Sequence, residues 1–421
     1  MSNWLKSTPA SLAFLLIGLV LGFPLGYVAS TIISPQSTSA PQTGQVREYR
    51  IGVTLPLSGE LSSIGKIWEK VVYLAFDDLN EEVKTYGFNV NFKPVILDDG
   101  TQDDKALANV QSFAQMGIKV VIGPAASSQV KAVKSFADAN HIVIISPSST
   151  APTLAIPNDF IFRTVGSDAK QAKALATLAY TQGARTVVVF HRNDEYGNAF
   201  AEFFTRYFSQ FNNTKVYDLP YQTGLSDYTS EVNALASKVQ STGADSVVLI
   251  AFDTDAANIL AHAAGNSVLS SVRWFLSEGP HGAQELLSPT IGQFAQKVRL
   301  LGTRPLFVHN PLYDEFAKKL KEKYGVEPTV FCDTLYDAIQ LAGWAILRAG
   351  KYDGDAIRAS LVEVAKHYYG PSGWTMFDEN GDKAFQDYGV WAIVKTDQGY
   401  QFMDVGVVQG DSVIFTTTPY R

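Results

Sequence analysis

The chain has 421 residues, of which 46% are hydrophobic and 18% are charged, and its formal net charge is −7. This apolar share excludes a disordered chain, and the acidic balance excludes a nucleic-acid binder, which needs a basic surface to neutralise phosphates. The single cysteine, Cys332, excludes an internal disulfide and a cysteine-based zinc site.

The N-terminal segment differs in composition from the rest of the chain. Residues 11–33 contain no charged side chain, and at about 1.5 Å per residue a helix of this length crosses a bilayer core of ~30 Å. Residues 1–33 are therefore predicted to hold a transmembrane helix that anchors the protein, with a cleaved signal peptide as the alternative. Residues 34–46 are rich in Ser, Thr, Pro and Gln, which predicts a linker to an extracytoplasmic body.

The body alternates short apolar runs with segments of helical periodicity, a pattern typical of an α/β fold. The predicted strands are residues 50–55, 90–97, 120–123, 142–145, 186–190, 246–251 and 274–276. The predicted helices are residues 68–79, 106–116, 169–180, 199–208 and 232–239. The pattern restarts after about residue 166, which favours two doubly wound, Rossmann-like lobes with ligands bound beyond the carboxyl ends of the strands.

Small hydroxyl residues follow three strands of the first lobe. The segments are P-L-S-G-E-L-S-S-I-G at 56–65, P-A-A-S-S-Q at 124–129 and S-P-S-S-T-A-P at 146–152. Each such segment suits an ordinary helix cap or turn, but a hydroxyl and free N–H groups at a helix N-terminus also hold an anion. Three of them at successive strand ends favour a site for a carboxylate.

Eight short motifs, in order, resemble those of the type I periplasmic binding proteins of branched-chain amino-acid ABC transporters. They are P-L-S-G (56–59), V-I-G-P (121–124), I-S-P-S-S-T (145–150), F-R-T (162–164), D-E-Y-G (194–197), S-E-G (277–279), L-Y-D-A (335–338) and G-P-S-G-W-T-M-F-D-E-N-G-D (370–382). The resemblance implies a Venus-flytrap fold, in which two lobes joined by three crossovers close around one small ligand. Lobe 1 is then expected at 48–165 plus 302–389 and lobe 2 at 166–301 plus 390–421, with hinges near residues 164, 301 and 390.

The resemblance also implies roles for individual residues. Ser127 would bind a ligand carboxylate with Thr150, and Ser149 would meet the ligand ammonium through its carbonyl oxygen, again with Thr150. Tyr196 would cover the ligand, and Glu278 would be the negative partner of the ammonium. A buried ammonium needs such a partner, because an unpaired buried charge is very costly. The remaining expected pocket residues are Phe331, Phe252 and Ile64, the last standing where the family often has an aromatic residue.

Catalytic and metal-binding patterns are missing from the sequence. It contains no G-x-S-x-G, GxxxxGK[ST] or HExxH string. The six histidines are dispersed, and only His281 is close in sequence to a predicted site residue. We therefore expect no catalytic residues, no cofactor and no metal.

The sequence predicts the extracytoplasmic substrate-binding protein of an ABC importer. Its ligand would be an amino acid or similar small carboxylate, and its partners would be permease subunits and, through the N-terminal helix, the membrane. The alternative is a ligand-sensing receptor ectodomain of the same fold. Only six residues, ending at Lys6, precede the uncharged stretch, too few for a cytoplasmic output domain, and this favours transport.

Overall fold

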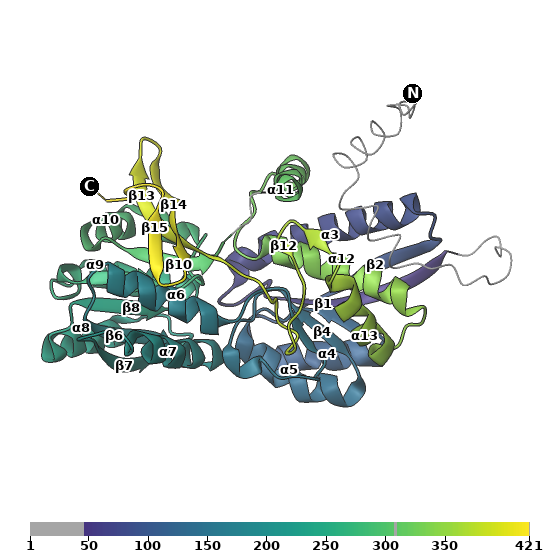
Figure 1. Ribbon diagram of the computed structural model, residues 1–421, viewed down its shortest axis with the longest axis horizontal. Coiled ribbons are helices and arrows are strands. Elements are labelled where there is room, and N and C mark those ends of the chain that lie inside the picture. Colours follow the sequence, from purple (N-terminus) through teal and green to yellow (C-terminus); the bar gives the residue numbers. More distant parts are fainter. Residues whose placement is uncertain (1–45, 307–309, 421) are drawn as a thin grey trace, which may run out of the picture.

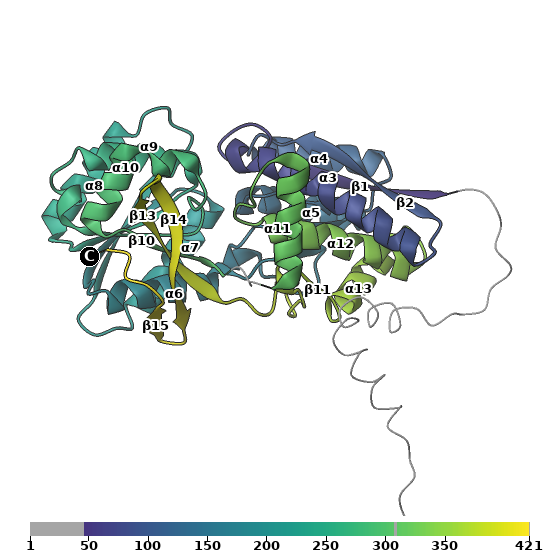
Figure 2. The ribbon, with the colours of Figure 1, turned by 90° about the horizontal axis from the view of Figure 1, so that it is seen from above.

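The computed structural model describes residues 46–306 and 310–420. They form two α/β units that lie side by side, each with its own sheet (Figures 1 and 2). The predicted anchor, and the predicted linker up to residue 45, lie outside the described residues. Within the described ranges, no helix is both long and apolar enough to span a bilayer.

The first unit is built on a parallel five-stranded sheet with the order β2-β1-β3-β4-β5. Its strands are β1 (Arg47–Leu55), β2 (Val90–Asp98), β3 (Val120–Ile122), β4 (Val143–Ser146) and β5 (Ile161–Arg163). The helices packed together on one face are α3 (Ser62–Thr85), α12 (Cys332–Ala349) and α13 (Gly354–Ala365), with α11 (Pro311–Tyr324) against α3. Those on the other face are α4 (Asp103–Gln115) and α5 (Ser127–Asn140) (Figure 1).

The second unit is built on an eight-stranded sheet with the order β15-β14-β13-β10-β9-β8-β6-β7. Five strands are parallel: β6 (Thr186–Arg192), β7 (Lys215–Tyr221), β8 (Ser246–Ile250), β9 (Arg273–Leu276) and β10 (Leu301–Pro305). Three antiparallel strands extend the sheet: β13 (Tyr388–Thr396), β14 (Gly399–Gln409) and β15 (Ser412–Phe415). The helices are α6 (Asp168–Thr181), α7 (Glu195–Phe208), α8 (Thr229–Thr242), α9 (Asp253–Ala264) and α10 (Pro289–Val298).

Short elements complete the two units. They are the ribbon of β11 (Tyr369–Gly370) and β12 (Gly373–Trp374) and the 3₁₀ turns η1 (Pro152–Leu154), η2 (Leu269–Ser271) and η3 (Gln284–Leu287).

All seven predicted strands and all five predicted helices are confirmed, with boundaries within a few residues except where α3 extends further at both ends. The central strands are buried along their whole length, as a parallel sheet covered on both faces requires. The expected changes of lobe at 301/302 and 389/390 fall inside β10 and β13. Both strands pair with each other and belong wholly to the second sheet.

In β10, close backbone packing takes the place of the apolar run that is typical of the other parallel strands. Its glycine, Gly302, lies under the ring of Trp391 in β13, where a Cβ atom would come within 2.2 Å of the ring. The strand is therefore held by a glycine–tryptophan contact and by ladder hydrogen bonds, without the apolar run that marks the other parallel strands.

Helix caps place the first turns of two helices that face the cleft. The Asp194 carboxylate accepts a hydrogen bond from the Gly197 N–H at 2.9 Å and starts α7, so that Tyr196 lies in the first turn of this helix. A side chain at Gly197 would collide with the Arg192 carbonyl oxygen, 2.0 Å from an added Cβ. Ser167 caps α6 in the same way, through the Ala169 N–H.

Candidate functional site

A narrow cavity lies between the two units, at the carboxyl ends of their parallel strands. The segments after β3 and β4 and the starts of α3 and α12 contribute from the first unit, and the segments after β6, β8 and β9 contribute from the second. The lining residues are Leu61, Ile64, Trp68, Ala125, Ala126, Ser127, Ser148, Thr150, Tyr196, Phe252, Glu278, Gly279, Val330 and Phe331. Seven of the eight predicted site residues are among them, and Ser149 is not.

The N-terminus of α5 forms part of the cavity wall. Ser127 is the first residue of this helix and is 2% exposed. Its hydroxyl oxygen accepts hydrogen bonds from the Ser149 hydroxyl at 3.1 Å and from the Ala151 N–H at 3.3 Å. The N–H groups of a first helical turn have no partner within the helix, and the helix dipole favours negative charge there. This helix N-terminus suits a small anion such as a carboxylate.

Ser149 lies behind the cavity wall and supports Ser127. Its carbonyl oxygen, expected at a ligand ammonium, accepts a hydrogen bond from Arg163 Nη1 at 3.2 Å. Thr150 does line the cavity, but its hydroxyl donates to Asp168 Oδ2 at 2.6 Å. Ser149 therefore does not line the cavity as expected, and its carbonyl oxygen already accepts a hydrogen bond from a buried arginine on β5.

Two buried carboxyl groups lie at the cavity: Glu278 lines it, and Asp168 lies behind Thr150, to which it is hydrogen-bonded. Glu278 follows β9 and is 3% exposed, and its Oε2 accepts a hydrogen bond from Gln171 Nε2 at 2.5 Å. Burial raises the pKa of Glu278 to about 7. Asp168, at the start of α6, is fully buried, and burial together with the nearby Glu278 charge raises the pKa of Asp168 well above its ordinary value. Among the residues that line the cavity, none is basic.

Asp168 and Gln171 were not predicted as site residues. Both lie on α6, in a stretch that has the composition of an ordinary helix surface. Their one signal is position, because α6 directly follows β5, the last strand of the first sheet. In such folds the segments after strand ends gather at the ligand site.

Aromatic and aliphatic side chains form the rest of the wall. The rings of Tyr196 and Phe252 stack with centroids 5.4 Å apart, and the Tyr196 hydroxyl donates to Ser277 Oγ at 2.8 Å. Phe331 lies opposite, on the first unit, and its backbone has φ 62°. A bulky residue rarely adopts this left-handed conformation, and backbone strain of this kind clusters at functional sites. The apolar wall is suited to a hydrocarbon side chain of a ligand.

Polar contacts hold the two units together beside the cavity. Arg192 of the second unit forms an ion pair with Glu60 of the first at 2.8 Å, and Lys131 of the first pairs with Glu195 of the second at 2.6 Å. A short hydrogen bond from the Ser63 hydroxyl to the Asp253 carboxylate also joins the units. The structure is thus a closed conformation, in which the cavity retains about 30 Å³.

His281, the histidine closest in sequence to Glu278, does not line this cavity. Its ring packs against Trp391 and Phe402, with centroids 5.4 and 4.8 Å away. Burial lowers its pKa well below the ordinary value, so the ring is neutral at physiological pH and belongs to an aromatic cluster.

Comparison with known proteins agrees with this architecture. Residues 48–399 match the family model described as periplasmic binding protein. The chain is 27% identical over 394 residues to the uncharacterized protein MJ1266 of Methanocaldococcus jannaschii, covering 88% of this chain and 92% of that protein. It is 25% identical to the leucine-, isoleucine-, valine-, threonine- and alanine-binding protein of Pseudomonas aeruginosa, covering 81% of this chain and 89% of that protein.

Solved structures share the fold. The leucine-binding protein LivK of Thermotoga maritima has a TM-score of 0.71 and 24% identity, covering 88% of this chain and 98% of that one. The LivJ protein of Streptococcus pneumoniae, solved with isoleucine, has a TM-score of 0.71 and 21% identity, covering 86% of this chain and 99% of that one. The α/β fold with two units, expected from the sequence motifs, is confirmed, and the chain belongs to the periplasmic binding protein family.

Proposed function

We propose that the protein is the extracytoplasmic substrate-binding component of an ABC importer and captures an α-amino acid with an aliphatic side chain. The observation that carries the proposal is the polarity of the closed cavity. A helix N-terminus with Ser127 and the buried carboxyl group of Glu278 both line it, together with apolar side chains. An α-amino acid complements this set, because its carboxylate and its ammonium each meet a partner of opposite polarity and its hydrocarbon side chain meets the apolar wall.

The names of the relatives support the same ligand class. The relative from P. aeruginosa is described as binding leucine, isoleucine, valine, threonine and alanine, and the S. pneumoniae structure holds isoleucine. The members of this family bind solutes and do not catalyse reactions. We infer that binding shifts an open–closed equilibrium towards the closed form, which a membrane permease then recognises.

A thermal-shift screen of residues 47–421 tests this function. A ligand that binds only the folded state raises the melting temperature by mass action. Leucine, isoleucine and valine are expected to raise it, and isobutylamine and 4-methylpentanoate, which each lack one charged group, are expected to have much smaller effects. If an uncharged amide stabilises the protein while no α-amino acid does, the assignment of a zwitterion is wrong.

We expect the affinity for leucine to fall about tenfold between pH 8 and pH 6. The ammonium needs ionised Glu278, whose pKa in the empty site is raised to about 7 by burial. Below this pH the carboxyl group is protonated and the attraction is lost, so affinity rises with pH and levels off above the pKa. Isothermal titration calorimetry at several pH values measures the effect. A constant affinity between pH 6 and pH 8 would contradict it, and 4-methylpentanoate serves as the control without an ammonium.

The substitution Glu60→Gln should weaken leucine binding about two- to tenfold, although Glu60 does not line the cavity. It removes the ion pair with Arg192 that joins the units, and so destabilises the closed form alone. Arg192 keeps Asp194 at 2.5 Å and Asp255 at 2.9 Å, so the fold of the second unit is preserved.

The control for this prediction is Glu202→Gln, which removes an ion pair of the same length, 2.8 Å to Arg206, within α7. Its leucine affinity should equal that of the parent protein. Calorimetry compares the three proteins, and equal affinities for Glu60→Gln and Glu202→Gln would show that the contact does not contribute to closure.

We further propose that residues 11–33 anchor the protein in the membrane, on the basis of their length and lack of charge. Residues 34–46 then hold the binding body on the extracytoplasmic face. Fractionation of cells that express the full chain or residues 47–421 tests the anchor. The full chain should stay in the membrane fraction after a high-salt wash, and recovery in the soluble fraction with a shortened N-terminus would instead show a cleaved signal.

A further inference from the structure

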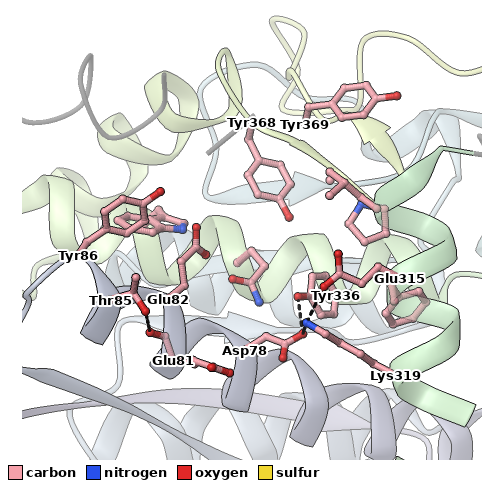
Figure 3. A pocket seen from close by; sticks show the side chains of 16 residues that line it. Asp78, Glu81, Glu82, Thr85, Tyr86, Glu315, Lys319, Tyr336, Tyr368 and Tyr369 are labelled. Atoms are coloured by element: carbon pink, nitrogen blue, oxygen red, sulfur yellow. Dashed lines mark hydrogen bonds and ion pairs between the residues drawn. The ribbon is translucent and has the colours of Figure 1, made fainter. Parts of the chain in front are cut away.

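A second cavity lies in the first unit, away from the cleft. It has a volume of about 410 Å³, within the range of small-molecule sites. Its walls come from the C-terminal part of α3, from α11 and α12, and from the segment around β11 (Figure 3). It shares no lining residue with the cleft cavity, so neither the amino acid nor lobe closure accounts for it.

Aromatic rings form much of this wall. Trp344 and Phe316 are buried, 3% and 2% exposed, and Tyr86 meets Trp344 edge-on with centroids 5.8 Å apart. The ring of Tyr368 lies on the other side of the opening (Figure 3). Faces of Trp and Tyr attract cations, and several rings around one space form the cage that binds organic ammonium groups.

The charges around this cavity are mostly negative. The acidic residues that line it are Asp78, Glu81, Glu82 and Glu315, and Lys319 is the one basic residue among the 16 lining residues. Lys319 is already shared between Asp78, at 3.3 Å, and Glu315, at 3.0 Å. The remaining two carboxylates, Glu81 and Glu82, form no ion pair with a residue that lines the cavity.

Glu82 is the carboxylate placed to bind a ligand. Its side chain is partly buried and rises between Tyr86 and Tyr368 (Figure 3). Its hydrogen-bond partner is the indole of Trp344, and burial raises the pKa of Glu82 to about 7. This carboxylate lies among aromatic rings and forms no salt bridge with the surrounding wall, so it can pair with an entering cation.

We propose that this aromatic and acidic cavity binds a small organic ammonium ion that carries an apolar or aromatic body. The ammonium group would lie against Glu82 and the ring of Trp344, and the body would fill the space towards Tyr368. A neutral molecule gains only the apolar contacts, and an anion meets a surplus of negative charge.

Calorimetric titration of 2-phenylethylammonium into the full chain, with saturating leucine to fill the cleft, tests the proposal. One probe ion is expected to bind per chain, and the neutral analogue 2-phenylethanol is expected to bind at least tenfold more weakly. No detectable binding of the ion at millimolar concentration, or equal binding of the two probes, would overturn the proposal.

Variants locate the site. Glu82→Gln should weaken the probe at least tenfold and leave leucine binding unchanged. The matched control, Glu69→Gln, makes the same change of charge on the same helix, about 20 Å away along its axis, and should bind the probe like the parent. Glu278→Gln should also bind it like the parent. Loss of probe binding in Glu278→Gln would place the ion in the cleft and refute the second site without refuting amino-acid binding.

The dependence of probe affinity on pH gives a second test of the role of Glu82. Entry of a cation favours ionised Glu82, so affinity for the probe should rise about tenfold from pH 6 to pH 8. The other ionisable groups that face Glu82 or line the same cavity are Asp78, Glu81, Tyr86, Glu315, Lys319, Tyr336, Tyr368 and Tyr369. A rise that persists in Glu82→Gln would show that one of these groups titrates instead and would overturn the role of Glu82.

Discussion

Replacing Glu278 by glutamine is expected to lower the affinity for leucine by about 30-fold to several-thousand-fold, because the ligand ammonium is left without its charged partner. Removing one member of a buried, hydrogen-bonded charge pair costs about 2–5 kcal/mol of binding free energy. Glu278 is 3% exposed, so water cannot replace the lost carboxylate. Calorimetry with leucine at pH 8 measures the loss.

Without ligand, Glu278→Gln should be more stable than the parent protein at pH 8. A carboxyl group whose pKa is raised on folding is least favourable above its folded pKa, and that of Glu278 is raised to about 7 by burial. Glutamine also relieves the neighbouring Asp168, whose pKa the charge of Glu278 raises. A higher melting temperature without ligand therefore accompanies the weaker binding, and this combination separates loss of the ammonium partner from misfolding.

Two comparisons make the prediction specific to the ammonium. The deaminated analogue 4-methylpentanoate should bind the parent and Glu278→Gln about equally, because it has no ammonium group to pair with Glu278. Glu379→Gln, which changes an exposed glutamate outside the cavity, should leave leucine binding unchanged. Similar losses for leucine and for 4-methylpentanoate in Glu278→Gln would remove Glu278 from the ammonium role.

The cleft residues that directly follow strands could be predicted from the sequence. Ser127, Tyr196 and Glu278 each follow a short apolar run, and the topology of a doubly wound sheet brings such positions to one edge. Asp168 and Gln171 could not be found in this way. They lie inside a helix with the composition of a solvated face. Only tertiary packing buries them, at 0% and 1% exposure: Asp168 is hydrogen-bonded to Thr150 of the first unit and Gln171 to Thr303 of β10.

The same limit explains why β7, β14 and β15 are not among the predicted strands, and why the second cavity is not predicted. In β7 the burial alternates with exposure, and β14 and β15 are largely exposed, so none of the three shows the continuous apolar run of a covered strand. Glu82 lies among charged residues of α3, which as a sequence indicate a solvated helix surface. Its partners Trp344 and Tyr368 are more than 250 residues away along the chain, and only the tertiary fold brings them together.

The largest loss of stability is expected from Arg163→Met. The guanidinium of Arg163 is fully buried and donates from Nε and Nη2 to the two carboxylate oxygens of Asp382, both at 2.5 Å. With methionine at position 163, Asp382, which is 2% exposed, is a buried charge without a partner. Breaking a buried pair in this way costs about 3–5 kcal/mol of unfolding free energy. Chemical denaturation of the protein without ligand measures the loss.

A double variant shows whether the stability loss in Arg163→Met comes from the unpaired charge of Asp382 or from lost packing. In Arg163→Met with Asp382→Asn the carboxylate is gone, so the double variant should be more stable than Arg163→Met alone. Its leucine affinity should nevertheless stay low, because Arg163 Nη1 also donates to the carbonyl oxygens of Ser149, at 3.2 Å, and Ala151, at 2.8 Å. These two residues flank Thr150 in the cavity wall. A double variant whose stability loss equals the sum of the two single losses would show that the pair acts through packing alone.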